Sequence, residues 1–258
     1  MNFAIMNFVL SGAIGIIGIL TLRKVSVAKE IVFALLPLLF ALHQFTQGFV
    51  WLGLNNLTDA NTLQIAKTIF IFYAQGLLQF LVPLAIWLLE PQGTRKTIIG
   101  ILTVLGAILT IYTLWGLYVY PTSVSIQNSA LVYVNPATKH FWVAALYILT
   151  TCGSLIFSSS IAIQLFGLLN LFGITVVHLL KPYAFTSVWC LYAAVVSVVL
   201  YFYFIERRVA FLNNLKEQEY ALSEKLEIEL TQLQEKAPMV HKKARDYFQS
   251  MIEKSRRL

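Results

Sequence analysis

The chain has 258 residues, of which 58% are hydrophobic and only 12% are charged, whereas a soluble domain carries about 25% charged residues. This composition excludes a water-soluble globular protein and predicts a membrane protein. The net charge of +7 does not indicate a nucleic-acid partner. The basic residues stand in short clusters beside apolar runs, as they do in proteins whose positive charge fixes their orientation in a membrane.

Seven apolar runs have the length of a transmembrane helix. We expect an all-α membrane protein, a seven-helix bundle with spans at residues 3–22, 31–54, 63–89, 98–120, 141–157, 161–180 and 183–205. The first run is expected to be a retained helix rather than a signal peptide, since no basic residue precedes it and no small-residue cleavage site follows it.

The one long loop between spans covers residues 121–140. Apolar and aromatic residues in this loop flank the turn signal Gln127-Asn128-Ser129. This pattern predicts a small hairpin or a folded lid at the outer end of the bundle.

The composition changes after residue 205, because residues 206–258 hold 11 of the 19 Lys and Arg and 9 of the 12 Asp and Glu. We expect this segment to be a cytoplasmic helical tail that is broken near Pro238. Leucines recur in its first part at the spacing of a coiled-coil seam: Leu215, Leu222, Leu226 and Leu233. Glu219 and Glu229 fall on the same seam, so self-association and a solvated single helix both remain open. The part after Pro238 reads as a basic amphipathic helix for the inner leaflet, for a partner, or for packing on the first tail helix.

Basic residues beside the spans predict the orientation of the bundle. If the N-terminus is outside, the inner loops carry Lys29 and six orientation-setting residues: Arg23, Lys24, Arg95, Lys96, Arg207 and Arg208. The outer side then carries Lys67, Lys139 and Lys181. The positive-inside rule therefore predicts an N-out, C-in multi-pass protein of the cell inner (plasma) membrane, with a cytoplasmic tail.

Polar side chains inside the spans are the candidate ligand-binding residues, because polar groups are costly in hydrocarbon and face the bundle interior. There are seven candidates: His43, Gln47, Gln75, Gln79, Asn170, His178 and Trp189. We expect them to line a polar cavity in the middle and outer part of the bundle. The alternative is that they only hydrogen-bond one another and lock the helices together.

Several stretches resemble an uncharacterised bacterial family of seven-helix membrane proteins, a domain of unknown function. They are LLPLLFALHQFTQGFVWLGL at 35–54, LVPLAIWLLEP at 81–91, and TCGSLIFSSS, LFGLLNLFG and YAFTSVWCLYAAVVSVVLYFYF between 151 and 204. The resemblance covers about residues 1–205, and it implies the topology but no activity. Gln47 stands where the family often has Glu, and Asn-Phe-Ala at 2–4 replaces its usual Cys-Phe-Ser. If the family's site uses that carboxylate, this chain has lost a proton-linked or metal-linked role.

Enzymatic chemistry has little support in the sequence. The seventh run has no lysine for a retinal Schiff base, and His43, His140 and His178 cannot easily meet a carboxylate at a zinc ion. Cys152 lies in the inner half of its span, whereas His178 lies near the outer surface. The two therefore cannot act together as nucleophile and general base. Cys152 and Cys190 are expected to be buried thiols. We therefore expect no catalytic or metal-binding residue, and the sequence names no cofactor.

A receptor-like or sensor module is the preferred interpretation, with a small molecule or lipid in an outward-facing cavity and a cytoplasmic protein partner for the tail. A membrane scaffold that acts through its tail is the alternative, and a neutral-solute carrier is the second alternative, because the spans lack rings of charge. A membrane metallo-hydrolase is the remaining, less favoured class. The expected partners are the lipid bilayer, a ligand, and a tail partner or a second copy, but no nucleic acid.

Overall fold

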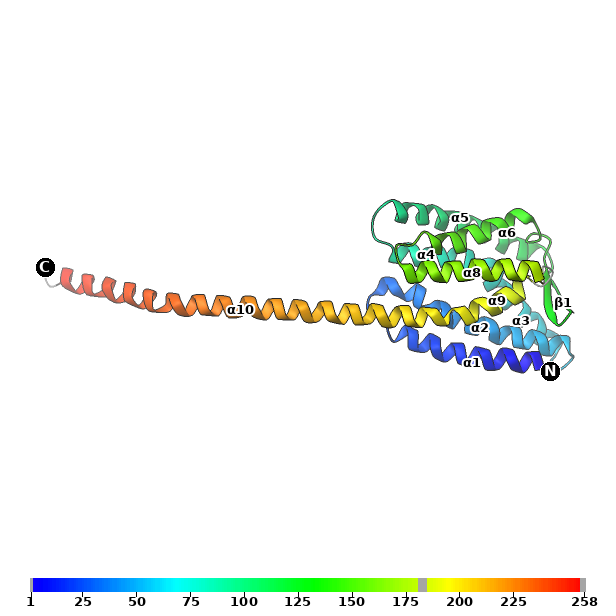
Figure 1. The fold of residues 1–258 in the computed structure, drawn as a ribbon, viewed down its shortest axis with the longest axis horizontal. Coiled ribbons are helices and arrows are strands. Elements are labelled where there is room, and N and C mark those ends of the chain that lie inside the picture. Colours follow the sequence, from blue (N-terminus) through cyan, green and yellow to red (C-terminus); the bar gives the residue numbers. More distant parts are fainter. Residues whose placement is uncertain (1, 181–184, 256–258) are drawn as a thin grey trace. The chain divides into compact units, whose positions relative to one another are not determined.

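A computed structural model describes residues 2–180 and 185–255. Figure 1 shows helices that run side by side, with a β-hairpin at one end of the bundle. In chain order the elements are α1 (Asn2–Leu22), the 3-10 turn η1 (Ala28–Glu30), α2 (Ile31–Leu54), α3 (Ala60–Ile71), the π-helical η2 (Phe72–Leu77), α4 (Leu78–Leu89), α5 (Thr94–Val119), β1 (Ser123–Gln127), β2 (Ala130–Val134), α6 (Phe141–Ile148), the π-helical η3 (Leu149–Gly153), α7 (Ser154–Ile156), α8 (Ile161–Leu180), α9 (Phe185–Val196) and α10 (Val198–Ser255). Residues 1–208 and 209–258 form two separate compact units.

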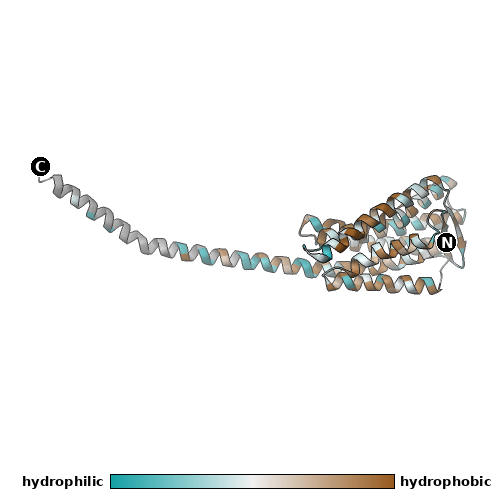
Figure 2. Ribbon diagram, turned by 90° about the horizontal axis from the view of Figure 1, so that it is seen from above, coloured by the Kyte–Doolittle hydropathy of each residue, from teal (hydrophilic) through white to brown (hydrophobic). Residues whose placement is uncertain are grey.

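Apolar helices dominate the first unit. Within the described residues, six helical stretches are long and apolar enough to cross a membrane, and the apolar helix Phe141–Ile156 is shorter. Figure 2 shows apolar residues along the bundle helices and hydrophilic ones gathered toward the helix ends. The chain is therefore a multi-pass helical membrane protein.

The last expected span and the tail differ from the sequence-based expectation. The seventh run is divided at Ser197, whose hydroxyl donates to the Ala194 carbonyl at 2.6 Å, a local bond that bends helices. The expected break near Pro238 is wrong, because α10 continues through this residue to Ser255. Proline removes only one backbone donor, and the good helix formers around it keep the remaining hydrogen bonds of the helix.

The expected hairpin in residues 121–140 is confirmed. β1 and β2 pair antiparallel from Ser123 opposite Val134 to Gln127 opposite Ala130. Asn128 and Ser129 form the two-residue turn, both with positive φ, 44° and 62°, which matches the twist of a tight hairpin. We call this end of the bundle the hairpin end.

An aromatic stack attaches the hairpin to the helices. Tyr133 of β2 stacks on Phe70 of α3 with ring centroids 4.5 Å apart, and Phe70 stacks on His43 of α2 at 3.9 Å. All three side chains are buried. The hairpin is therefore part of the packed core and holds the loop between α5 and α6 in place.

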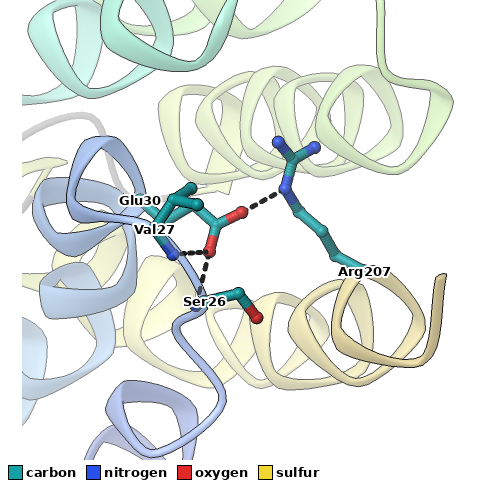
Figure 3. A network of polar contacts seen from close by, with 4 residues as sticks. All are labelled: Ser26, Val27, Glu30 and Arg207. Carbon is teal, nitrogen blue, oxygen red and sulfur yellow. Dashed lines mark hydrogen bonds and ion pairs between the residues drawn. The ribbon is translucent and has the colours of Figure 1, made fainter. Parts of the chain in front are cut away.

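The opposite end, which we call the basic end, contains two buried carboxylates. Glu30, 2% exposed, accepts hydrogen bonds from the backbone N–H groups of Ser26 and Val27 and forms an ion pair with Arg207. Figure 3 shows these four residues around the carboxylate. The pair ties the α1–α2 connection to α10. Without Arg207, the buried charge of the Glu30 carboxylate would lack an ionic partner.

Glu90 makes the second connection at the basic end. Its carboxylate accepts from the Ser158 hydroxyl at 3.1 Å and from the Ser159 N–H at 2.9 Å. Arg95 donates to the Ser158 carbonyl at 3.0 Å, and Lys96 donates to the Glu90 carbonyl at 3.0 Å. The turn between α7 and α8 is thus fixed to the connection between α4 and α5.

Candidate functional site

A large cavity in the first unit opens at the hairpin end between α6 and α8. Its volume is about 700 Å³, within the range of small-molecule pockets. The segment after β2 closes one side, and α6 and α8 form the two walls. Its lining includes Gln75, Tyr133, Thr138, Lys139, Ala144, Ala145, Ile148, Leu171, Ile174, His178 and Thr186.

Two smaller cavities continue from it toward the middle of the bundle. The first, about 70 Å³, shares Gln75, Thr138 and Thr186 with the open cavity. The second, about 20 Å³, shares Tyr147 and Trp189 with the first. The three spaces therefore lie one behind another and lead from the hairpin end into the apolar core, and we call them the cavity series.

Gln75 stands where the open cavity meets the first inner one. Its side-chain amide donates to the Thr186 hydroxyl of α9 at 3.2 Å and accepts from the Thr138 hydroxyl at 2.9 Å. It belongs to the π-helical segment η2, and such wide turns are frequent at functional sites. Gln75 thus joins α9 and the loop before α6 at the point where the cavity narrows.

Tyr147 lines both inner cavities. Its side chain is 7% exposed, and its hydroxyl has no hydrogen-bond partner among the described residues. Its ring contacts Trp189 edge to face at 5.3 Å. The π-helical segment η3 begins two residues later, where Thr150 and Thr151 both donate to the Tyr147 carbonyl, at 3.1 and 2.7 Å. A second wide turn, η3, therefore also borders the cavity series, where Thr151 and Cys152 line its innermost cavity.

The mouth of the open cavity carries the charged and titratable groups. Lys139 and His178 line it and are exposed. Tyr133 lines it from β2, and its hydroxyl has no partner among the residues that the structure describes. Burial raises the pKa of the Tyr133 phenol well above its ordinary value of 10.0, so it stays a neutral donor.

The structure brings only some of the sequence-predicted residues together. Gln75, His178, Asn170 and Trp189 all line the cavity series. Asn170 also donates to the Phe166 carbonyl of its own helix at 2.8 Å.

The other three predicted residues bond to neighbouring helices away from the cavity series. His43 contacts the Phe70 carbonyl through Nε2 at 3.0 Å. Gln79 donates to the Thr113 hydroxyl of α5 at 2.7 Å. Gln47 donates to the Ser187 hydroxyl of α9 and lines a separate groove, of about 540 Å³, on the α1 side of the bundle.

Sequence reasoning missed Tyr133, Thr138, Lys139 and Tyr147 as lining residues. The hydroxyl of Tyr147 is a polar group inside an apolar run, which is the same signal that selected the glutamines. Tyr133 and Thr138 lie in a loop, where only the tertiary packing of the hairpin brings them to the cavity. In the sequence, Lys139 contributes only to the count of basic residues on the outer side of the membrane.

The described lining of the cavity series offers neutral hydrogen-bonding groups and aromatic rings, with Lys139 at the mouth. Among the described residues, no three His, Cys, Asp or Glu side chains lie close enough together to hold a metal ion. Such a lining can hold and orient a ligand by hydrogen bonds and apolar contact.

Comparison with known protein families matches residues 2–214 to the family of unknown function DUF6629. No curated protein and no solved structure matches the chain.

Proposed function

The chain belongs to DUF6629, a family of unknown function, and we propose that it is a receptor-like binding module whose cavity series takes up a small molecule or lipid. The proposal places the N-terminus and the hairpin end outside and the tail in the cytoplasm of a bacterial cell. The positive-inside count supports this orientation, because Arg23, Arg95 and Arg207 lie at the basic end, opposite the hairpin.

One observation carries the proposal. Tyr133 and Tyr147 line the cavity series, and their buried hydroxyls have no partner among the described residues. Leaving a buried polar group unpaired costs about 1–3 kcal/mol, so a bound molecule with acceptor atoms would recover a stabilising interaction at two depths.

Coupling to the tail follows from the position of α9. Thr186 and Trp189 of α9 line the inner cavity, and the chain continues after Ser197 into α10. A ligand that binds one arrangement of α9 more tightly than another shifts the population of the two arrangements. We therefore propose that occupancy is passed along α9 and α10 to a cytoplasmic partner of the tail.

Native mass spectrometry of the protein, extracted gently from its own membrane, tests the proposal. We expect an added mass that Gln75→Leu removes, because Gln75 stands at the junction of the two larger cavities. Gln79→Leu is the matched control: it also breaks an interhelical bond, but Gln79 lines none of the three cavities. Two results would contradict a binding role. One is an empty wild-type bundle, and the other is that both variants lose the added mass to the same extent while also losing stability.

A scaffold that acts through the tail is the second candidate. Leu215 and Leu222, one heptad apart, are exposed at 46% and 60% in the second unit, and exposed leucines at this spacing favour pairing of helices. The same mass spectra test this candidate. A scaffold predicts a bundle without ligand and a dimer that disappears when residues 209–258 are deleted.

A further inference from the structure

We propose that the open cavity between α6 and α8 takes a long-chain fatty acid from the surrounding bilayer, with its carboxylate at Lys139 and Tyr133 and its alkyl chain between the two helices. This inference rests on the proposed function and narrows it to one class of ligand.

The α6–α7 segment and α8 are in close contact at one end and separated at the other. Near the basic end, a Cβ on Gly167 of α8 would lie 2.7 Å from the Cβ of Leu155 of α7, so only glycine allows this approach. Toward the hairpin end, the 700 Å³ cavity separates α6 from α8, and Figure 1 shows α6 inclined to α8. The space between the helices is therefore wedge-shaped and widest at the hairpin end.

The wedge is open on its side along the apolar lengths of both helices. Ala144 and Ala145 of α6 and Leu171 of α8 line it and are exposed. The small alanine side chains leave the room that larger residues would fill. A chain from the bilayer can thus enter between Ile148 and Ile174 without passing through water.

Apolar contact alone gives such a ligand little affinity, because lipid tails are as apolar as the groove. The polar end must supply the preference. Lys139 lies two residues before the first residue of α6, and His178 lies in the last turn of α8. Both therefore stand where the helices leave the hydrocarbon, which is the depth of a lipid head group.

The charge at this depth favours a carboxylate. Among the described lining residues, Lys139 is the one formal cation, and none is acidic. A single positive charge matches a monoanionic carboxylate better than a dianionic phosphate monoester. Tyr133, whose side chain is 9% exposed, lines the same cavity, and its buried hydroxyl has no partner among the described residues. Together they provide one charge-assisted and one neutral hydrogen bond for the two carboxylate oxygens.

Photo-crosslinking of the full-length protein in its membrane tests this inference. The probe is a sixteen-carbon fatty acid with a diazirine in mid-chain, and the competitors are palmitate and hexadecanol, which share the chain but differ in charge. We expect crosslinks on α6 and α8 that palmitate suppresses at about a tenfold lower concentration than hexadecanol, the effect of one charge-assisted hydrogen bond.

Two variants identify the head-group site. Lys139→Gln and Tyr133→Phe should each raise the palmitate concentration needed for competition, the first by about tenfold. Lys67→Gln and Tyr118→Phe are the matched controls, because these residues line a different groove, between α3 and α5. They should leave the competition unchanged.

Three results would overturn the inference: crosslinks spread over all lipid-facing helices, equal competition by palmitate and hexadecanol, or stronger competition by a single-chain phosphate monoester. If native spectra still show a mass that Gln75→Leu removes, the binding function stands and only the ligand class fails. If they show no bound mass, both fail.

Discussion

At the scale of single residues, two glutamines in the membrane interior are equally buried but differently paired. Gln44 and Gln79 are both 0% exposed. Gln79 donates to Thr113 and to the Gly76 carbonyl, whereas neither amide atom of Gln44 has a partner among the described residues. Because hydrocarbon offers no replacement partners, the two side chains should contribute to stability with opposite sign.

Replacing each glutamine by leucine, which has a similar volume, tests this difference. Gln44→Leu removes an unpaired amide and should raise the unfolding free energy by about 1–3 kcal/mol. Gln79→Leu breaks an interhelical bond and should lower it by about 1 kcal/mol. Thermal unfolding in detergent measures both, with shifts of roughly 2–4 °C per kcal/mol. A lower melting temperature for Gln44→Leu would mean that a group outside the described chain satisfies its amide.

Residue identity predicted which polar groups lie in the bundle, but not which of them share a cavity. Gln75 and Gln79 lie four residues apart in one apolar run, and the sequence predicts the same cavity-lining role for both. The π-helical turn that contains Gln75 changes the direction of its side chain relative to Gln79, so one lines the cavity series and the other bonds α5. Neither hydropathy nor the spacing of polar residues signals such a turn.

At the scale of elements, glycine decides how closely α4 and α5 approach. A Cβ on Gly106 of α5 would lie 2.0 Å from the Gln79 carbonyl oxygen of α4, and backbone atoms cannot move aside as a side chain can. Helix pairs in membranes use small residues in this way, since close packing replaces the hydrophobic driving force.

Alanine substitution separates this packing role from helix propensity. Gly106→Ala should lower the unfolding free energy by about 1–3 kcal/mol, because the added methyl group forces the helices apart. Gly12→Ala is the control, because Gly12 is exposed in α1 and no atom lies within 4 Å of an added Cβ. This substitution should raise the unfolding free energy by up to about 1 kcal/mol. Equal effects in thermal unfolding would show that the α4–α5 contact adapts.

The helices themselves could be predicted because length and hydropathy determine which runs can cross a bilayer. The ends are less well determined: α3 begins at Ala60, where the Asp59 carboxylate accepts from the Thr62 N–H at 2.9 Å, three residues before the apolar run that marked the span. Capping hydrogen bonds set such ends. The hairpin was predictable from its turn residues, but its packing on Phe70 was not, because tertiary contacts leave no periodic signal.

At the scale of the whole molecule, the two ends of the bundle differ in charge and in structure. At the basic end Arg95 donates to the Ser158 carbonyl, Arg207 pairs with the buried Glu30, and Arg208 donates to the Arg23 carbonyl. The hairpin end carries the opening of the cavity series. If positive charge sets the orientation, the cavity faces outside, where a receptor-like module would meet its ligand.

Accessibility of introduced cysteines to a membrane-impermeant maleimide tests this orientation. Cys152 and Cys190, 2% and 1% exposed, should leave the wild type unlabelled. Gln127→Cys, at the end of β1 beside the hairpin turn, should react in intact cells, whereas Gln92→Cys, exposed in the connection between α4 and α5, should react only after permeabilisation. The reverse pattern would place the cavity in the cytoplasm, where its mouth would meet the inner leaflet and any ligand would come from inside the cell.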